Sequence, residues 1–197
     1  MADKTLLLLC GILLAGFGLT RLIYRKKGKV TVKDGVAYAP SVMYRFNQDD
    51  LTWLARAIHG EAGTNAEGGA AVAWTALNNF MLVIGNAGRR PRFPAFWECI
   101  RAYSSVLSPR WATLDAPGCR EHPENCTQSQ LRRRREITAM SWDRIPTAIR
   151  ELVLRFSRGE LKNPVGNAVD WASFGFDGAE RRIAGNYFGK LPFRRLV

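Results

Sequence analysis

The pattern of apolar and polar positions predicts two consecutive amphipathic helices in the first half of the chain. In the first helix, apolar residues recur at the three-and-four spacing of a buried helical face: Leu51, Leu54, Ala55, Ile58 and Ala62. Asn47 supplies the N-cap of this helix, and Gly60 and Gly63 supply its stop signals. The second helix extends from about Ala66 to Met81, with Asn65 as its cap.

Glu61 falls in the last turn of the first predicted helix, on the margin of the apolar face. At about 100° per residue, it projects within roughly 20° of Leu54. Apolar surroundings and the negative end of the helix dipole both disfavour an anion there, and so favour the protonated form that a general acid needs. Glu67 differs, because it lies in the first turn of the second helix, where the dipole stabilises a carboxylate. The alternative interpretation of Glu61 is a surface residue paired with an arginine.

Two more helices are predicted in the second half of the chain. One is short and extends through about Tyr103, and the other begins at Pro146 and stops at Gly159. The apolar face of the latter contains Ile149, Leu152, Val153 and Phe156.

Short runs rich in β-branched and aromatic residues lie near both ends of the chain. Lys29–Ala39 alternates around Asp34-Gly35 and predicts a hairpin that acts as a stalk, with the globular domain beginning near Tyr44. Asn167–Phe176 and Arg182–Phe188, separated by the turn residues Asp177-Gly178, predict a hairpin packed beside the helices. The expected fold is therefore α+β and mainly helical, a single domain with a small C-terminal β-hairpin.

The N-terminus is almost wholly apolar from Thr5 to about Leu22, which predicts a transmembrane signal anchor over residues 1–24. A basic linker over residues 25–45 and the domain over residues 46–197 follow, with a polar insertion near 112–135. A cleaved signal peptide or a buried helix is the alternative to the anchor. The cations after the apolar run would keep the domain cytoplasmic. They are Arg21, Arg25, Lys26, Lys27 and Lys29.

The composition is that of a basic globular protein. The chain has 197 residues, of which 47% are hydrophobic, and its 29 Lys and Arg outnumber 17 Asp and Glu, giving a net charge of +12. The charge favours an anionic partner such as nucleic acid, a membrane surface or the bacterial cell wall. Arg132–Arg135 could bind phosphates, but no aromatic residues are interleaved with them, so a solvated helix face is favoured and nucleic acid is a minor interpretation.

Cys119 and Cys126 lie in the polar insertion, and their spacing favours a disulfide that closes a small loop. Free thiols are one alternative. A zinc site that includes His122 is another, but a fourth ligand is not evident nearby. No metal and no cofactor are assigned.

Three motifs resemble the catalytic domain of the SleB-like cell wall hydrolases, which are known as spore cortex-lytic enzymes. They are Leu54–Ala62, Glu67–Ala73 with Leu77-Asn78-Asn79, and Arg182–Phe188. The resemblance implies a lysozyme-like fold that cuts the glycan strands of peptidoglycan, in characterised members as a lytic transglycosylase. It places Glu61 at the position of the catalytic glutamate.

The sequence departs from this family at several positions. Gly63-Thr64-Asn65 stands where members often carry Arg-Gly-Glu, and Trp74 replaces a small aliphatic residue. The segment 112–135 is unlike the short loop expected there. These departures affect the expected substrate contacts more than the glutamate.

The functional hypothesis is a lytic transglycosylase that cleaves between N-acetylmuramic acid and N-acetylglucosamine, with Glu61 as acid and base. This chemistry needs one carboxylate, whereas hydrolysis needs two; Asp170 and Asp177 lie in the last hairpin. By resemblance and residue type, the substrate-binding candidates are Asn78, Trp171, Asn186 and Tyr187. For Trp171 and Tyr187, a packed core aromatic is an equal alternative.

The expected location is the cell envelope, with the N-terminal helix in the membrane and the domain in the periplasm. The flanking cations oppose that topology. The alternative is that the protein is carried in a phage virion with other virion proteins and opens the wall for entry of the phage genome. The alternative function is a structural protein whose degenerate lysozyme-like domain binds DNA or membrane through its basic surface.

Overall fold

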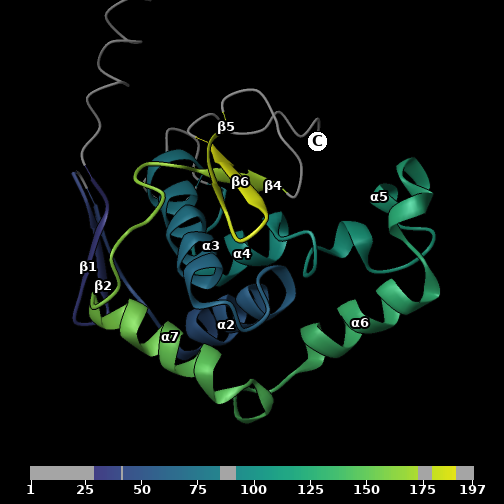
Figure 1. The fold of residues 1–197 in the computed structure, drawn as a ribbon, viewed down its shortest axis with the longest axis horizontal. Coiled ribbons are helices and arrows are strands. Elements are labelled where there is room, and N and C mark those ends of the chain that lie inside the picture. The colour runs from purple at the N-terminus through teal and green to yellow at the C-terminus, as the bar shows by residue number, and fades with distance from the viewer. Residues whose placement is uncertain (1–28, 41, 85–91, 173–178, 190–197) are drawn as a thin grey trace, which may run out of the picture.

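The computed structural model describes residues 29–40, 42–84, 92–172 and 179–189. They form a mainly helical structure with two small antiparallel sheets (Figure 1), which confirms the predicted α+β class. Among these residues, no helix has the length and apolar character that a membrane span requires. The transmembrane segment expected over residues 1–24 lies outside the described ranges.

The two helices predicted from the apolar pattern are α2 (Gln48–Glu61) and α3 (Ala66–Asn79). Asn47 caps α2 in a reciprocal capping box with Asp50. Asn65 caps α3 by accepting a hydrogen bond from the Gly68 N–H. A π-helical turn, η1 (Phe80–Ile84), follows α3 directly, so the helical path continues past the expected end at Met81.

The remaining helices connect α3 to the C-terminal sheet. They are α4 (Phe96–Tyr103), η2 (Pro109–Trp111), α5 (Pro117–Glu121), η3 (Pro123–Asn125), α6 (Gln128–Ala139), η4 (Trp142–Arg144) and α7 (Thr147–Arg158). The predicted ends of α4 and α7 are confirmed, and α7 stops at Gly159 in the left-handed conformation.

The main core lies where α2, α3 and α7 pack against one another. Helix α3 occupies the centre, because every residue from Ala71 to Asn79 is buried. Its neighbours contribute large side chains that are almost fully buried, among them Leu54, Ile58, Phe96 and Phe156.

The N-terminal sheet contains β1 (Thr31–Lys33), β2 (Val36–Ala39) and β3 (Val42–Arg45) in that order, all antiparallel. The predicted turn at Asp34-Gly35 is present, with both residues at positive φ.

This sheet belongs to the domain and is not the stalk expected from the sequence. Val30 and Ala37 have no exposed surface and lie in the main core, and the Gly35 N–H donates to the Ser157 carbonyl at 2.8 Å. The sequence predicted a linker over residues 25–45, but from Val30 onward these residues are part of the domain. Their alternating apolar side chains, which could have faced solvent, pack against α7.

The C-terminal sheet contains β4 (Asp170–Ala172), β5 (Ala179–Ile183) and β6 (Asn186–Gly189) in the order β4-β6-β5. The tight turn of the hairpin is Ala184-Gly185, between β5 and β6. The turn residues Asp177-Gly178 singled out in the sequence lie outside the described ranges. This small sheet packs beside α3 (Figure 1).

Candidate active site

Glu61 is the last residue of α2, and its side chain is partly exposed. The hydroxyl groups of Ser104 and Ser105 both donate to Oε1 of Glu61, each at 2.9 Å. Among the described residues, no hydrogen bond reaches Oε2. The described part of the chain therefore fixes one carboxylate oxygen of Glu61 by hydrogen bonds and not the other.

The segment that carries these serines is held against the end of α2. Ser104 is fully buried, and its Oγ also accepts a hydrogen bond from the Val106 N–H at 3.2 Å. The Val106 side chain packs on Gly60, where a Cβ atom would lie 2.6 Å from Val106 Cγ1. Gly60, expected as a helix stop, lies within α2 and instead permits this close approach.

The β5–β6 turn reaches the same end of α2. A Cβ atom on Gly68 would lie 2.9 Å from the Cβ of Ala184 and 3.3 Å from that of Ala62, the residue after Glu61. Two segments more than a hundred positions apart in the sequence therefore meet next to the residue that follows Glu61.

Two of the four expected substrate-binding residues lie on this hairpin. Asn186 and Tyr187 begin β6, and both are half-buried. The Arg182 guanidinium lies 5.3 Å from the centre of the Tyr187 ring, a cation–π distance that covers one face of the ring.

The other two expected residues lie inside the domain. Asn78 is fully buried, and its Nδ2 donates to the carbonyls of Gly166 and Ala168 at 2.9 and 2.8 Å. Trp171 is 8% exposed and belongs to the main core, opposite Phe188 of β6. In this arrangement these two side chains support the sheet and the loop before it, and present little surface to a ligand.

Asp170 lies at the end of the C-terminal sheet that is farther from the Ala184-Gly185 turn. It lies opposite Gly189, at the end of β6 away from the Ala184-Gly185 turn, about 10 Å along the strand from Asn186. It is buried, and its Oδ1 accepts the Trp171 N–H. Asp177, the other carboxylate considered, lies outside the described residues.

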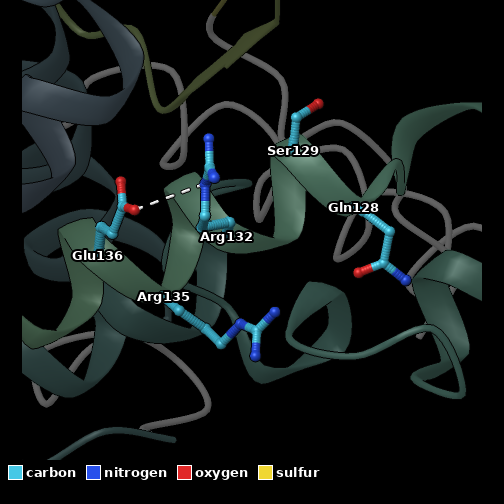
Figure 2. A pocket seen from close by; sticks show the side chains of 5 residues that line it. All are labelled: Gln128, Ser129, Arg132, Arg135 and Glu136. Atoms are coloured by element: carbon cyan, nitrogen blue, oxygen red, sulfur yellow. Dashed lines mark ion pairs between the residues drawn. The ribbon is translucent and has the colours of Figure 1, made fainter.

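Helix α6 packs against α2 and carries the four consecutive arginines. Its outer face has an open hollow lined by Gln128, Ser129, Arg132, Arg135 and Glu136 (Figure 2). Arg132 pairs there with Glu136 at 3.7 Å. Glu61 is not among the residues that line this hollow.

Arg134 is half-buried between α6 and the polar insertion. Its Nη1 donates to the Trp111 carbonyl at 3.4 Å and approaches Cys126 Sγ at 3.6 Å, and its guanidinium lies 5.6 Å from the centre of the Trp111 ring. Burial lowers the pKa of Arg134, while the negative charge of Glu61 opposes this effect. The two side chains are therefore electrostatically coupled.

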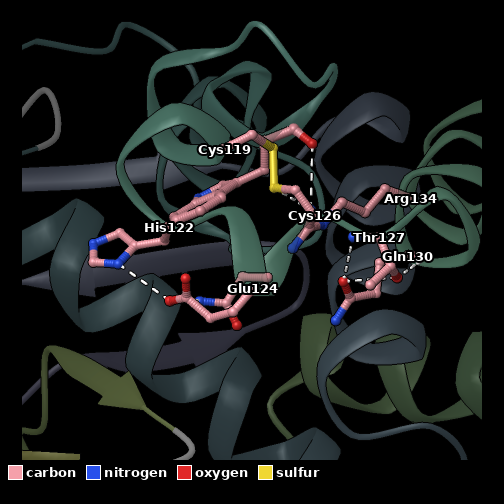
Figure 3. The surroundings of a disulfide bond; sticks show 9 residues. Cys119, His122, Glu124, Cys126, Thr127, Gln130 and Arg134 are labelled. Atoms are coloured by element: carbon pink, nitrogen blue, oxygen red, sulfur yellow. Dashed lines mark hydrogen bonds and ion pairs between the residues drawn. A yellow bond between two sulfur atoms is a disulfide. The ribbon is translucent and has the colours of Figure 1, made fainter.

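The predicted disulfide between Cys119 and Cys126 is present, with Cα atoms 5.5 Å apart (Figure 3). With Leu131 and Trp111 it forms a small second core, separate from the main one. Both sulfur atoms are used in the disulfide, so the zinc alternative does not apply to them. The insertion is consequently a packed platform that holds Trp111 beneath Arg134.

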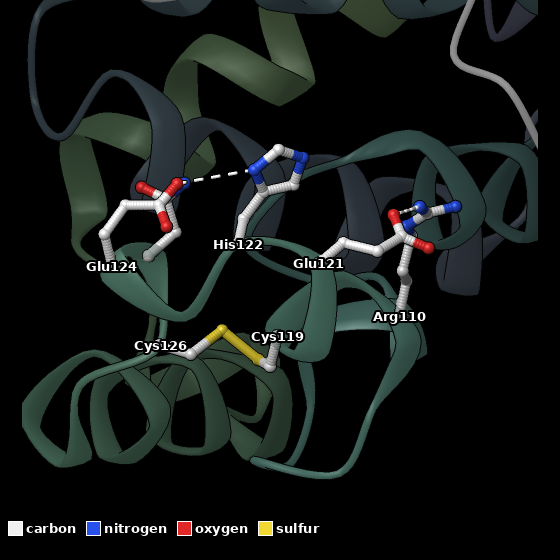
Figure 4. A network of polar contacts seen from close by, with 7 residues as sticks. Arg110, Cys119, Glu121, His122, Glu124 and Cys126 are labelled. Atoms are coloured by element: carbon white, nitrogen blue, oxygen red, sulfur yellow. Dashed lines mark hydrogen bonds and ion pairs between the residues drawn. A yellow bond between two sulfur atoms is a disulfide. The ribbon is translucent and has the colours of Figure 1, made fainter.

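Ion pairs lie on the outer surface of this platform (Figure 4). Arg110 pairs with Glu121, and His122 Nδ1 lies 3.4 Å from Glu124 Oε1. All four side chains are substantially exposed, so these pairs contribute little to stability.

His59 lies two residues before Glu61 and is half-buried. Burial lowers its pKa, and the positive charge of Arg133 lowers it further. Its Nδ1 is buried without a hydrogen-bond partner among the described residues. A neutral, packed imidazole is thus favoured at neutral pH.

The sequence pattern did not indicate Ser104, Ser105, Val106 or Arg134 as parts of the site. The serines follow the end of α4 without a spacing that relates them to Glu61, and Arg134 was one of four equivalent arginines. The chain matches no family model, no curated protein and no solved structure. A function therefore has to be inferred from the residues around Glu61 themselves.

Proposed function

We propose that this chain is a peptidoglycan-cleaving enzyme with a lysozyme-like domain, and that Glu61 is its general acid and base. The observation that carries the proposal is the asymmetric setting of Glu61. Two serine hydroxyls fix Oε1, while Oε2 has no donor among the described residues. A carboxyl group held in one orientation, with one oxygen available, suits proton transfer to a bound substrate.

In the proposed reaction, protonated Glu61 donates its proton to the oxygen that joins N-acetylmuramic acid to N-acetylglucosamine. The bond from the muramic C1 to that oxygen breaks as positive charge develops at C1. The Glu61 carboxylate then accepts the proton of the muramic 6-hydroxyl, whose oxygen attacks C1 and closes a 1,6-anhydro ring. Glu61 regains its proton, and no water is consumed.

The position of Asp170 supports this route over hydrolysis. A hydrolase of the two-carboxylate type needs its second carboxylate within about 10 Å of the first, facing the sugar. Asp170 is buried at the far end of β6 and accepts a backbone hydrogen bond. It is therefore a poor partner for Glu61.

The β5–β6 hairpin supplies the candidate contacts to the sugars. Asn186 can exchange hydrogen bonds with hydroxyl or acetamido groups, and the Tyr187 ring can pack on a sugar face. Both are half-buried on the hairpin whose turn packs at Gly68, beside Ala62. The net charge of +12 favours adsorption to an anionic wall.

The disulfide supports a location outside the cytoplasm. Bonds such as Cys119–Cys126 persist in oxidising compartments and are rare in reducing ones. We place the domain in the periplasm or cell envelope, held by the apolar N-terminal segment. Carriage in a phage virion would satisfy the same requirement and would avoid the unfavourable charges after that segment.

The test compares Glu61→Gln with Glu67→Gln in the full-length chain in detergent micelles, on purified cell-wall sacculi. Glu67 is the matched control, since it is an exposed glutamate in the first turn of α3. Glu61→Gln should lower the rate of wall clearance by at least about a hundredfold, and Glu67→Gln should leave it unchanged. Both variants should keep the far-ultraviolet circular dichroism of the wild type. Full activity in Glu61→Gln would sink the proposal.

A non-enzymatic binding protein is the second candidate, and the exposed arginines of α6 favour it. Arg132, Arg133 and Arg135 all face solvent. Retardation of DNA with a steep salt dependence, together with no release of muropeptides from sacculi, would support this function over the first.

A further inference from the structure

The N-terminal sheet has one face in the core and one face in solvent. Val32 and Ala37 lie opposite each other on the inner face, and both belong to the main core. The sheet lies at one edge of the molecule, with α7 packed against β1 (Figure 1). On the outer face, Tyr38 and Met43 lie opposite each other and are 39% and 71% exposed. They are two of the four large apolar side chains that are exposed in the described part of the chain.

Two basic side chains lie beside this apolar pair on the outer face. Lys33 and Arg45 stand in register on either side of Val36, two positions along the strands from the pair, or about 7 Å. Both are exposed, and neither forms an ion pair within the described ranges. Asp34 is the one acidic residue in the segment 31–45. The outer face therefore combines exposed apolar surface with a net positive charge.

The sequence before this sheet favours a lipid surface as the partner of that face. Five residues, 25–29, separate the anchor predicted over residues 1–24 from Val30, which is in the core. Four of the five are basic: Arg25, Lys26, Lys27 and Lys29. A connection of this length spans at most about 20 Å, whatever its conformation. The sheet is therefore kept close to the headgroups of the membrane that holds the anchor.

We propose that the outer face of the N-terminal sheet docks on an anionic lipid surface. Lys33 and Arg45 lie among the lipid phosphates, and Tyr38 and Met43 lie where the headgroups meet the acyl chains. Basic side chains are attracted to an anionic membrane surface. Tyrosine is favoured at the same depth, because its ring is apolar and its hydroxyl is polar. Nucleic acid would account for the two cations but not for the exposed apolar pair between the strands.

This inference uses the predicted anchor and does not depend on the chemistry of Glu61. The Tyr44 hydroxyl of β3 donates to Asp50 Oδ2 at 3.0 Å, near the start of α2. Glu61 follows Asp50 by eleven residues, which is roughly 16 Å along the helix. The sheet thus contacts the end of α2 opposite to Glu61, so a docked sheet and a glycan at Glu61 do not compete for one surface.

The test places a polarity-sensitive fluorophore at Met43→Cys or at Leu114→Cys in the full-length chain with Cys10→Ala. Cys99 is 3% exposed and the two remaining cysteines form the disulfide, so labelling is confined to the new thiol. Leu114 is the matched control, because it is 51% exposed and precedes α5, at the opposite edge of the molecule from β1 (Figure 1). The labelled chains are reconstituted into vesicles of phosphatidylcholine and phosphatidylglycerol, with and without lipids that carry a nitroxide quencher at the headgroup.

The fluorophore at position 43 should shift its emission to the blue and be quenched by the nitroxide lipids, whereas the fluorophore at position 114 should show neither effect. Lys33→Gln combined with Arg45→Gln should lower the ratio of docked to free sheet about 25-fold, because each cation near an anionic surface contributes about fivefold. Arg132→Gln combined with Arg133→Gln removes the same charge from exposed positions of α6 and should leave this ratio unchanged.

Three results would overturn the docking. A blue shift at position 43 without nitroxide quenching would mean that a second copy of the chain covers this face. Quenching at position 43 no stronger than at position 114 would mean that the face stays in water. Equal losses in the two charge variants would mean that net charge alone is sensed. Digestion of sacculi tests the enzymatic role separately, and its failure would leave the docking intact.

Discussion

The two serines that hold Glu61 make unequal contributions, and their replacement by alanine should separate positioning from folding. Ser104 is fully buried, and among the described residues its hydroxyl makes two hydrogen bonds, one to Glu61 Oε1 at 2.9 Å and one from the Val106 N–H at 3.2 Å. Ser105 is partly exposed, and within the same ranges its hydroxyl makes only the 2.9 Å hydrogen bond to Glu61. Ser104→Ala therefore also removes the link to the segment that packs on Gly60.

A hydrogen bond to a charged group contributes about 1.5–3 kcal/mol, and a neutral one about 0.5–1.5 kcal/mol. Ser104→Ala should accordingly lower the free energy of unfolding by about 2–4 kcal/mol. Ser105→Ala should lower it by about 1 kcal/mol, because water can replace the exposed hydroxyl. Since a small domain has about 5–15 kcal/mol, both variants should fold. Loss of orientation at a catalytic group costs up to about a hundredfold in rate, and Ser104→Ala should approach that value.

Urea unfolding gives the stabilities, and release of soluble muropeptides from sacculi gives the rates. Ser157→Ala is the matched control, because the Ser157 hydroxyl donates one hydrogen bond to the Leu154 carbonyl on α7. It should lose about 1 kcal/mol and keep wild-type activity. Full activity in Ser104→Ala, or a stability loss no larger than that of Ser105→Ala, would refute the positioning role of Ser104.

Three further predictions concern the scaffold. Gly159→Ala should lower the urea midpoint by the equivalent of about 2 kcal/mol or more, because φ is +81° and the new Cβ would lie 2.0 Å from the Val32 carbonyl oxygen; an unchanged midpoint would contradict this packing. Burial raises the pKa of Asp50 above its ordinary 3.8, so its contribution to stability is fully present below that pH and is lost as pH rises through the folded-state pKa. Asp50→Asn should flatten that part of the stability profile, whereas an identical slope in urea titrations across the acid range would argue against it. Reduction of the Cys119–Cys126 bond removes a loop constraint of about 2.5 kcal/mol, and it should slow wall cleavage while circular dichroism keeps most of its helical signal; equal rates with and without reductant would show that the platform does not support the site.

Local signals in the sequence were sufficient for the helices that frame Glu61. Asn47 and Asn65 cap α2 and α3 as expected. Each side chain accepts a hydrogen bond from the backbone N–H three residues later, so the cap depends only on residues nearby in the sequence. Gly159 ends α7 for a similarly local reason. The partial exposure of Glu61 also followed from helical geometry, since its angle to Leu54 is fixed by the helix itself.

Contacts between distant segments could not be obtained in this way. Ser104 meets Glu61 across 43 positions of sequence, and nothing in the local pattern relates them. Gly60 was interpreted as a helix stop, yet its missing side chain makes room for Val106. Residue type favoured Asn78 as a ligand contact, but a buried asparagine that bonds loop carbonyls satisfies the same pattern.

The N-terminal hairpin shows the same limit for domain boundaries. Its turn at Asp34-Gly35 was predictable from two residues, but the direction of its apolar face was not. Only the packing of Val30 and Ala37 in the main core shows that the domain includes this sheet.

The central claim is that Glu61 cleaves the glycan without a second carboxylate and without water. Digestion of sacculi by the wild-type chain in heavy-oxygen water, followed by mass spectrometry of the products, tests it most directly. We expect 1,6-anhydro-muramic ends that lack the mass of one water and carry no heavy oxygen, and no such products from Glu61→Gln. Reducing muramic ends that carry heavy oxygen would show hydrolysis and contradict the single-carboxylate mechanism, and unchanged products from Glu61→Gln would remove Glu61 from the reaction.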